Sequence, residues 1–234
     1  MIYRHAKRLL DLVLAVVALL LSLPFQAATA GAVAVRLGRP VLFRQVRPGL
    51  HGAPFVLVKF RTMLPVDPVR GPLDDASRMT GLGRVLRSTS LDELPTLWNI
   101  VRGQMSLVGP RPLLMQYLDR YTPQQARRHE VLPGLTGLAQ VSGRNGLSWD
   151  RKFALDVEYV DQCCMSLDIR ILLRTVRAVL RRDGVSGAGE VTMSEFMGEP
   201  VPQLPDPRPS LVIVGCGGFG REVYCRPGNQ CRRR

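Results

Sequence analysis

An apolar segment near the start of the chain constrains its fold more than any other feature. From Leu9 to Val35 the chain is almost continuously apolar. Basic residues stand on both sides of this stretch: Arg4, Lys7 and Arg8 before it, and Arg36, Arg39, Arg44 and Arg47 after it. A spanning helix usually has its excess of basic residues on the cytoplasmic side. Positive charge on both flanks therefore predicts that both ends of the segment stay in the cytoplasm.

Pro24 gives this segment a way to turn back. A proline inside a helix removes one backbone hydrogen bond and clashes with the preceding turn, and Ser22 can stabilise the bend by bonding a freed carbonyl. We therefore predict a re-entrant membrane anchor over residues 1–40, kinked at Ser22 and Pro24. Three alternatives stay open: a secretory signal peptide, a spanning helix of roughly 20 residues, and the buried helix of a soluble core.

Charge and composition limit the partners. The formal net charge of +13 and the pI near 10.5 indicate an anionic partner, which is nucleic acid, a phospholipid surface or a phosphorylated substrate. Aromatic residues make up only 6% of the chain, and no stacking platform or nucleic-acid-binding module is evident, so we expect no nucleic-acid partner. The five cysteines form no Cys-x-x-Cys pair, which argues against zinc and indicates free thiols in a reducing compartment.

The segments after the anchor mix strand and helix patterns, which predicts an α+β fold with a small β-hairpin and several helices. We expect the catalytic domain to cover residues 41–199. Its expected elements are strands at 41–43 and 55–60 around a turn at 48–52, a loop at 65–77, a helix from Leu91 to Gly103, a helix starting at Thr122-Pro123, and a loop at 132–137.

A helix predicted over residues 167–182 has two unlike faces. One face carries Arg170, Arg174, Arg177 and Arg181, and the other carries Leu172, Leu173, Val176 and Leu180. Such a helix suits the headgroup layer of a membrane, as an interfacial amphipathic helix. A core-packing helix with a solvated basic face is the equally weighted alternative.

The C-terminal part differs in composition. Five prolines between Pro200 and Pro209 predict a linker at 200–210. Residues 211–220 read as a strand entering a Gly-x-Gly-x-x-Gly turn, but the chain stops at Arg234, too soon for a dinucleotide-binding unit. Residues 211–234 resemble the opening of a sugar acetyltransferase. We interpret them as a truncated fragment of such a domain, disordered and inactive.

Two adjacent carboxylates, Asp92 and Glu93, follow Arg84 and Arg87 at a predicted helix start. Ser90-x-x-Glu93 is also a capping-box pattern, and acidic residues in a first turn are favoured by the helix dipole. The catalytic and structural interpretations are compatible. A helix N-terminus that stabilises a carboxylate also stabilises a bound phosphate and keeps an aspartate ionised as a nucleophile.

Further cations come from separate loops and from a strand end. A planar guanidinium suits bidentate phosphate binding. Any one of these cations alone is more simply a surface residue, but together with the carboxylate pair they predict a site for a diphosphate and a divalent metal. The residues expected to bind substrate are Lys59, Arg61, Arg87, Arg111, Arg144 and Asn145.

Over residues 3–198 the chain resembles the bacterial sugar transferase family, the small monotopic phosphoglycosyl transferases typified by the enzyme that initiates protein N-glycosylation in Campylobacter. The motifs that carry this resemblance are Lys7-Arg8-x-x-Asp11, Phe43-Arg44-Gln45-x-Arg47-Pro48-Gly49, Lys59-Phe60-Arg61-Thr62-Met63, Leu91-Asp92-Glu93-Leu94-Pro95, Gly109-Pro110-Arg111-Pro112 and Gly143-Arg144-Asn145. One departure is the anchor, where Leu23 separates Ser22 from Pro24 in place of an adjacent Ser-Pro pair.

The resemblance implies a mechanism. Asp92 and Glu93 would be the catalytic dyad, with Mg²⁺ as cofactor and Asp92 among its ligands. Asp92 would attack the sugar-linked phosphate of a UDP-sugar and release UMP, and polyprenyl (undecaprenyl) phosphate would then take the sugar-1-phosphate from the aspartyl phosphate. The enzyme would initiate glycan assembly at the cytoplasmic face of a bacterial inner membrane, in contact with phospholipid and with downstream glycosyltransferases.

The catalytic residues do not identify which sugar is transferred. The acetyltransferase-like fragment favours an acetamido sugar such as UDP-N,N'-diacetylbacillosamine. The alternative keeps the reaction but uses UDP-glucose or UDP-galactose, for exopolysaccharide or capsule. A non-catalytic membrane scaffold is the rival of a different class, and it predicts that Asp92 and Glu93 are dispensable.

Overall fold

The computed structural model describes residues 2–65, 75–143, 146–181 and 195–198. The chain divides into two units, Met1–Gly198 and Glu199–Arg234, and the predicted linker and C-terminal fragment lie outside the described residues. In chain order the elements are α1 (Ile2–Leu37), β1 (Leu42–Pro48), η1 (Leu50–Gly52), β2 (Pro54–Phe60), α2 (Asp75–Arg78), α3 (Gly81–Ser88), η2 (Leu91–Thr96), α4 (Leu97–Val101), β3 (Ser106–Val108), η3 (Met115–Arg120), α5 (Pro123–Ala126), η4 (Arg127–Glu130), β4 (Gly134–Thr136), α6 (Leu138–Ser142), α7 (Trp149–Gln162) and α8 (Met165–Arg181). The predicted mixture of helices and strands is confirmed.

The predicted hairpin is present and longer than expected. Strands β1 and β2 pair antiparallel from Leu42 opposite Phe60 to Pro48 opposite Pro54, so Pro48 belongs to the strand and not to the turn. The loop predicted at 132–137 is wrong in part, because it contains β4, which pairs parallel with β3. Glycine at 134 permits this pairing, since a Cβ there would lie 2.1 Å from the backbone nitrogen of Gly109.

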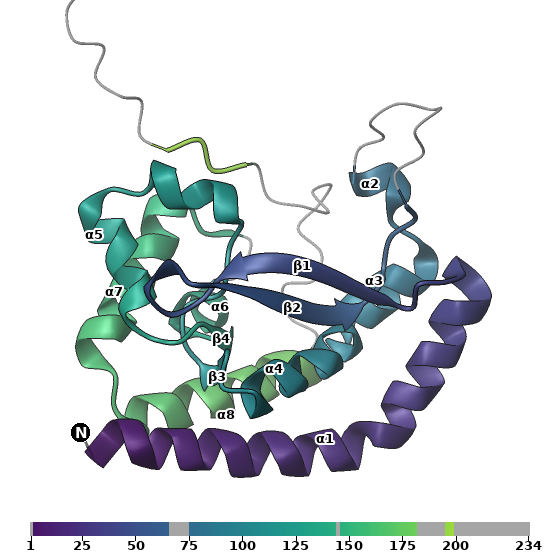
Figure 1. Ribbon diagram of the computed structural model, residues 1–234, viewed down its shortest axis with the longest axis horizontal. Helices are drawn as coiled ribbons and strands as arrows, with labels where there is room; N and C mark the ends of the chain where they lie inside the picture. Colours follow the sequence, from purple (N-terminus) through teal and green to yellow (C-terminus); the bar gives the residue numbers. More distant parts are fainter. Residues whose placement is uncertain (1, 66–74, 144–145, 182–194, 199–234) are drawn as a thin grey trace, which may run out of the picture. The chain divides into compact units, whose positions relative to one another are not determined.

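Helix α1 bends. Figure 1 shows its first part lying along the base of the unit and its second part turning upward toward the end of the hairpin. Pro24 lies inside this helix and supplies the physical cause, because the carbonyl one turn earlier loses its amide partner. The Ser22 hydroxyl donates to the Leu19 carbonyl at 3.1 Å and accepts from Gln26 at 2.9 Å. Ser22 therefore bonds a carbonyl near the bend, although not the one that Pro24 leaves free.

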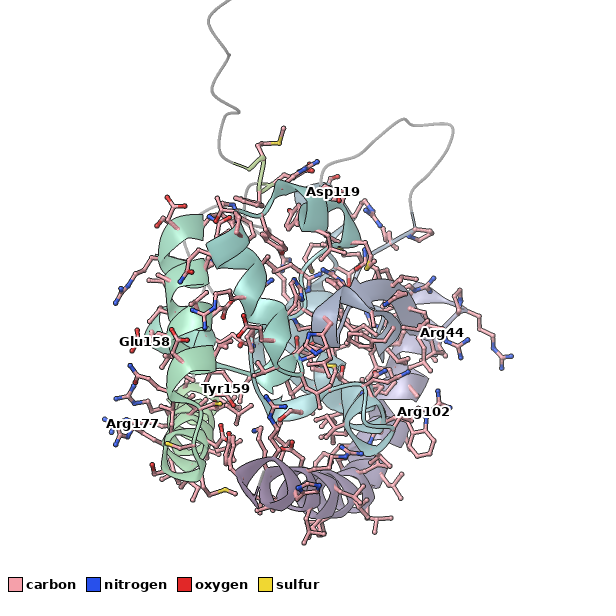
Figure 2. All side chains as sticks on the ribbon, turned by 60° about the vertical axis from the view of Figure 1, so that its left-hand side comes forward. Arg44, Arg102, Asp119, Glu158, Tyr159 and Arg177 are labelled. Atoms are coloured by element: carbon pink, nitrogen blue, oxygen red, sulfur yellow. The ribbon has the colours of Figure 1, made fainter. Side chains whose placement is uncertain are left out.

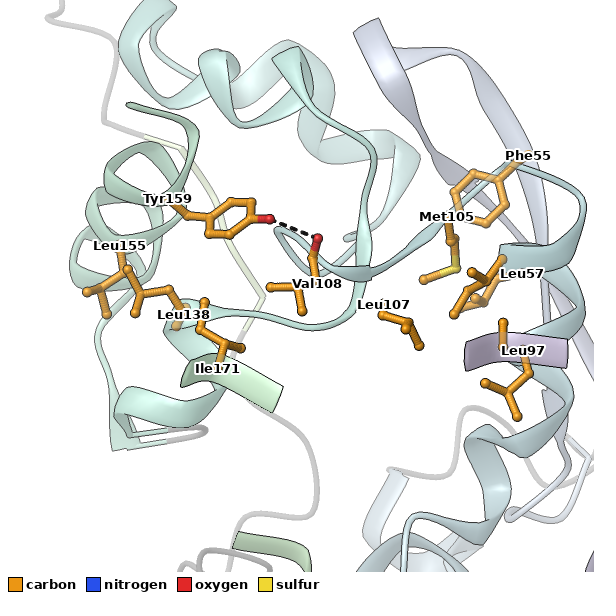
Figure 3. Close-up of a cluster of buried hydrophobic side chains, with 13 residues drawn as sticks. Phe55, Leu57, Leu97, Met105, Leu107, Val108, Leu138, Leu155, Tyr159 and Ile171 are labelled. Carbon is orange, nitrogen blue, oxygen red and sulfur yellow. Dashed lines mark hydrogen bonds between the residues drawn. The ribbon is translucent and has the colours of Figure 1, made fainter. Parts of the chain in front are cut away.

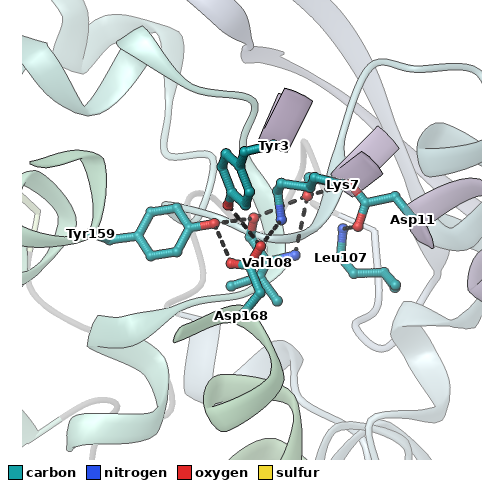
Figure 4. A network of polar contacts seen from close by, with 8 residues as sticks. Tyr3, Lys7, Asp11, Leu107, Val108, Tyr159 and Asp168 are labelled. Carbon is teal, nitrogen blue, oxygen red and sulfur yellow. Dashed lines mark hydrogen bonds and ion pairs between the residues drawn. The ribbon is translucent and has the colours of Figure 1, made fainter. Parts of the chain in front are cut away.

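The N-terminal end of α1 is tied to the rest of the unit by buried carboxylates (Figure 4). Lys7 and the Tyr3 hydroxyl each donate to Asp168 of α8 at 2.8 Å. On the other side of Asp168, the Tyr159 hydroxyl lies 2.7 Å from its second oxygen. Asp11 of α1 accepts from the Ser106 hydroxyl at 2.7 Å and from the Leu107 amide at 3.1 Å. Polar side chains near the N-terminal end of α1 thus attach this largely apolar helix to the rest of the domain.

The C-terminal end of α1 is tied to the same unit. The Arg61 guanidinium, from the residue that follows β2, donates to the carbonyls of Leu37 and Gly38, which are among the unpaired acceptors at a helix C-terminus. Nearby, Val33 and Leu37 pack with Phe60 of β2 and with α3 in a small buried cluster. Both ends of α1 therefore rest on one folded unit.

Between these ends, α1 presents apolar side chains to the outside. Among the described residues it is the one helix long and apolar enough to cross a membrane, with a mean hydropathy of 2.2 and only 17% of the apolar window buried. The exposed apolar side chains on it are Leu9, Val13, Leu14, Val16, Val17, Leu20, Leu21, Leu23, Phe25 and Val35. A contiguous surface of this kind is characteristic of a membrane contact, so α1 associates this protein with a membrane.

Helix α8 lies beside α1 and has three faces where the sequence predicted two. Ile171 and Asp168 are buried against the core, Arg170, Arg174 and Arg177 are exposed, and so are Ile169, Leu173 and Val176. Leu173 and Val176 point outward, on a face separate from both the basic face and the buried one. Figure 2 shows Arg177 projecting outward from α8. An exposed apolar face next to a basic one is the arrangement of an interfacial helix.

The main core joins the anchor to the catalytic elements. It includes Ala15 of α1, Phe55 and Leu57 of β2, and side chains from α4, β3, α6, α7 and α8. Figure 3 shows Leu97, Leu107 and Met105 on one side of this cluster and Leu138, Leu155 and Ile171 on the other. Helix α1 is therefore part of the hydrophobic core and not an appended segment.

A buried ion pair joins η4 to α7. Arg128 donates to Asp156 Oδ2 at 3.0 and 2.7 Å, and the two side chains are 2% and 6% exposed. Burial raises the pKa of Asp156, and the adjacent Arg128 opposes that shift. Arg128 also donates to the Tyr121 hydroxyl at 3.1 Å. Around this pair lies an aromatic cluster that Phe196 completes.

We predict that Arg128→Met lowers the stability of the protein strongly, because it leaves the Asp156 carboxylate buried without its counterion. Loss of one partner of a buried pair typically costs about 3–5 kcal/mol of unfolding free energy. The matched control is Arg127→Ala, since the ion pairs of Arg127 with Glu130 and Asp161 are exposed and exposed pairs contribute little. Thermal unfolding in detergent measures both variants. Equal shifts of the midpoint would contradict the prediction.

Candidate active site

The carboxylate pair lies on a short 3₁₀ helix. Asp92 and Glu93 belong to η2, which begins after Ser90. The capping-box interpretation of Ser90 and Glu93 is wrong, because Ser90 has a left-handed backbone with φ of 57° and its side chain makes no capping hydrogen bond. Glu93 is instead free to turn toward Arg111. The sharp turn at Ser90 thus directs both carboxylates away from ordinary helix capping.

Side chains from η2 and α4 fix this helix against β2. The Thr96 hydroxyl donates to the Val58 carbonyl at 2.9 Å. The Asn99 amide donates to the Val56 carbonyl at 2.7 Å and accepts from the Val58 amide at 3.2 Å. Asn99 therefore takes the place of a neighbouring strand along the free edge of β2. This contact sets the position of Asp92 and Glu93 relative to Lys59 on the same strand.

Three cations surround the pair. Arg111 Nη2 donates to Glu93 Oε1 at 2.7 Å, and both side chains are partly exposed. Lys59 of β2 and Arg87 of α3 are close enough to act electrostatically on Asp92. Arg87 also donates to the Thr62 hydroxyl at 3.2 Å, which holds its guanidinium at the end of β2. Three predicted cations from three separate segments therefore gather around the Asp92–Glu93 pair.

The two carboxylates have different pKa values. Burial, followed by the charge of Glu93, raises the pKa of Asp92 to about 6, although the nearby cations oppose the shift. Burial acts in the same direction on Glu93, but Arg111 and Lys59 hold the pKa of that group below its usual range. Burial and the charge of Arg111 lower the pKa of Lys59. Adjacent titratable groups with diverging pKa values are typical of catalytic sites.

Arg128 holds Arg111 in place. Its Nη2 donates to the Arg111 carbonyl at 2.7 Å while the same guanidinium pairs with Asp156. Upstream of Arg111, the loop passes close to another segment, since a Cβ at Gly109 would lie 2.3 Å from the Leu132 carbonyl oxygen. The loop that carries Arg111 is therefore fixed by a buried cation and by close backbone packing.

Asp92 and Glu93 could hold a magnesium ion only together with ligands from a bound substrate. Among the described residues no group of three or more His, Cys, Asp or Glu side chains could hold a metal. Magnesium is usually held by one or two carboxylates plus substrate phosphates and water, and Asp92 with Glu93 supplies that number. Burial and the charge of Glu93 raise the pKa of Asp92, and a divalent cation bound there would favour its ionised form.

The other predicted residues lie elsewhere. Arg61 bonds the end of α1, so the geometry gives it a role in joining α1 to β2, and its role in substrate binding stays a prediction. Arg144 and Asn145 lie outside the described residues. Sequence reasoning missed Thr96, Asn99, Arg128 and Asp156. Each acts through a partner far away along the chain, which no local pattern indicates.

Comparison with known proteins agrees with the expected family. A family model described as bacterial sugar transferase matches residues 2–182. The chain is 51% identical over 193 residues to an uncharacterized sugar transferase, EpsL, of Bacillus subtilis, covering 82% of this chain and 96% of that protein. The resemblance to the Campylobacter enzyme and the acetyltransferase-like fragment stay predictions.

Two further relatives carry names that state a reaction. The chain is 41% identical over 189 residues to the UDP-glucose:undecaprenyl-phosphate glucose-1-phosphate transferase of Caulobacter vibrioides, covering 76% of this chain and 70% of that protein. It is 38% identical over 199 residues to the undecaprenyl-phosphate galactose phosphotransferase of Salmonella typhimurium, covering 77% of this chain but only 42% of that longer protein. Because the family model covers most of the chain and these relatives align with the same part of it, this protein belongs to the bacterial sugar transferase family.

Proposed function

We propose that this protein transfers a hexose-1-phosphate from UDP-glucose or UDP-galactose to undecaprenyl phosphate and releases UMP. The observation that carries the proposal is the placement of Asp92 and Glu93 between Lys59, Arg87 and Arg111. A carboxylate pair within a ring of cations suits a reaction in which a nucleophile must approach a diphosphate.

The choice of sugar follows the relatives. The relative from Caulobacter is named for glucose and the relative from Salmonella for galactose. A relative from Klebsiella pneumoniae is also named for glucose. These names support the hexose alternative better than the acetamido sugar that the C-terminal fragment suggested. That fragment lies outside the described residues.

In the first proposed step, an ionised Asp92 oxygen attacks the phosphorus bonded to the sugar. The bond from that phosphorus to the bridging oxygen of UDP breaks, UMP leaves with that oxygen, and an aspartyl phosphosugar forms. Arg111 and Lys59 would neutralise charge on the phosphates, because like charge otherwise repels the incoming carboxylate. In the second step a phosphate oxygen of undecaprenyl phosphate attacks the same phosphorus and restores the Asp92 carboxylate.

Magnesium would supply additional charge neutralisation at the diphosphate when it is bound. Asp92 and Glu93 are the residues that would hold it. Glu93 stays ionised because Arg111 and Lys59 keep its pKa low. We therefore assign Glu93 to orienting the metal or substrate and Asp92 to the attack on phosphorus.

We further propose that α1 is a re-entrant anchor. The support is that Lys7 and Asp11 near one end and Leu37 at the other are bonded to the same folded unit. A helix held at both ends by one domain does not leave its ends on opposite sides of a membrane. Pro24 would provide the turn, and the basic residues on both flanks favour a cytoplasmic location for both ends.

The first test of function uses purified protein in detergent with Mg²⁺ and undecaprenyl phosphate. We expect UMP release with UDP-glucose or UDP-galactose, and little with UDP-N,N'-diacetylbacillosamine or UDP-N-acetylglucosamine. Release should depend on the lipid, with the radiolabelled sugar passing into the organic phase. Turnover confined to the acetamido sugars would overturn the hexose assignment, and no turnover with any of these donors would overturn the proposed reaction.

The second test addresses the intermediate. With the hexose donor and Mg²⁺ but no lipid, intact-protein mass spectrometry should find the added mass of a hexose phosphate. Asp92→Asn should abolish this adduct and turnover, because the amide keeps the shape of the side chain but loses the nucleophilic charge. Glu93→Gln should lower turnover while permitting some adduct. An active enzyme without adduct would favour direct transfer, and an Asp92→Asn variant with full activity would show that Asp92 is not the nucleophile.

The topology of α1 is tested by cysteine labelling in intact and permeabilised cells. Single cysteines near Arg4 and near Arg39, in a background without native cysteines, should both react only after the cytoplasm is opened. Labelling of one site from the periplasm would show that α1 spans the membrane. Pro24→Ala should straighten the helix and is expected to weaken the re-entrant arrangement.

A further inference from the structure

A groove lies between the C-terminal part of α1 and helix α3. It has a volume of about 470 Å³ and is lined by Gly31, Ala32, Val35, Arg36, Gly81, Leu82 and Val85. Two of its walls are glycines with open space in front of them, since a Cβ at Gly31 or at Gly81 would meet no atom within 4 Å. The groove is therefore apolar, unfilled and bordered by a single cation, Arg36.

The groove connects the anchor to the catalytic helix. Both α1 and α3 contact η2, which carries Asp92. Leu82 of the groove packs on the same buried cluster as Leu91, the residue before Asp92. On its outer side the groove continues into the exposed apolar surface, because Val35 and Val85 are both largely exposed. An apolar ligand in the groove would therefore lie between the exposed apolar surface and the buried cluster against which Leu91 packs.

We propose that this groove binds the part of the isoprenoid chain that adjoins the phosphate of the polyprenyl phosphate acceptor. This inference rests on the proposed function. The apolar walls of the groove suit a hydrocarbon chain, and the positive charge of Arg36 complements the negative charge of the phosphate as the lipid approaches. An unbranched, zwitterionic phospholipid has no such charge match. The apolar walls and Arg36 together would therefore favour an anionic isoprenoid lipid over a zwitterionic phospholipid.

Filling the groove tests the proposal. Gly31→Leu combined with Gly81→Leu should raise KM for undecaprenyl phosphate about tenfold or more, the effect expected when an apolar pocket loses its fit. The fold should be retained, since neither new side chain meets an atom at Cβ. Formation of the hexose-phosphate adduct without acceptor should stay unchanged. The matched control is Ala28→Leu, which adds the same apolar bulk at an exposed position of α1 outside the groove.

A second measurement is independent of turnover. A polyprenyl phosphate with a diazirine in its first isoprene units should label peptides that contain residues 31–36 or 81–85. Excess undecaprenyl phosphate should prevent this labelling, and excess phosphatidylglycerol should not. Labelling of these peptides in a protein that shows no turnover would support the groove as a lipid-binding site and overturn the proposed reaction. The proposed role of the groove would be overturned if filling it left the KM for undecaprenyl phosphate unchanged in an active enzyme. Labelling of other peptides, or equal competition by phosphatidylglycerol, would overturn it as well.

Discussion

The attachment of α1 to Asp168 and Asp11 is the constraint on which the rest of the structure depends. Each carboxylate is almost fully buried and would be costly to bury without its donors. Lys7 and Tyr3 supply those donors to Asp168, while Ser106 and Leu107 supply them to Asp11. Because a lipid-facing helix cannot leave such groups unpaired, these contacts fix which face of α1 turns toward the domain and which faces outward.

Electrostatics at the candidate site depend on a second buried layer. Arg111 meets Glu93 directly, but Arg128 holds the Arg111 backbone and is itself balanced by Asp156. Asn99 performs the corresponding task on the other side by fixing α4 to the edge of β2. The carboxylate pair thus sits between two rigid supports. Such support is required where charges must keep their geometry as a reaction proceeds.

Local patterns predicted the hairpin, the long apolar first helix with its proline, the helix of α8 and the gathering of Lys59, Arg87 and Arg111 around Asp92, because each depends on motif residues or short-range periodicity. Other features were beyond such patterns. Strand β4 has three residues and a partner strand that precedes it by more than twenty positions. Ser90 looked like a helix cap until its backbone proved left-handed. The arrangement of α8 depends on which neighbours cover it, and that is a property of the whole fold.

The long-range pairing of α1 also has a consequence for the order of biosynthesis. Lys7 and its acceptor Asp168 are separated by 161 positions, so the first helix to leave the ribosome meets its partner only after α8 has emerged. At ordinary rates of synthesis this delay is roughly 10–30 s. During that interval Lys7 lacks its acceptor in α8, and deep burial of that end of the helix in lipid would be unfavourable. The N-terminal end of α1 therefore reaches its final position only after α8 has been synthesised, as the domain closes around it.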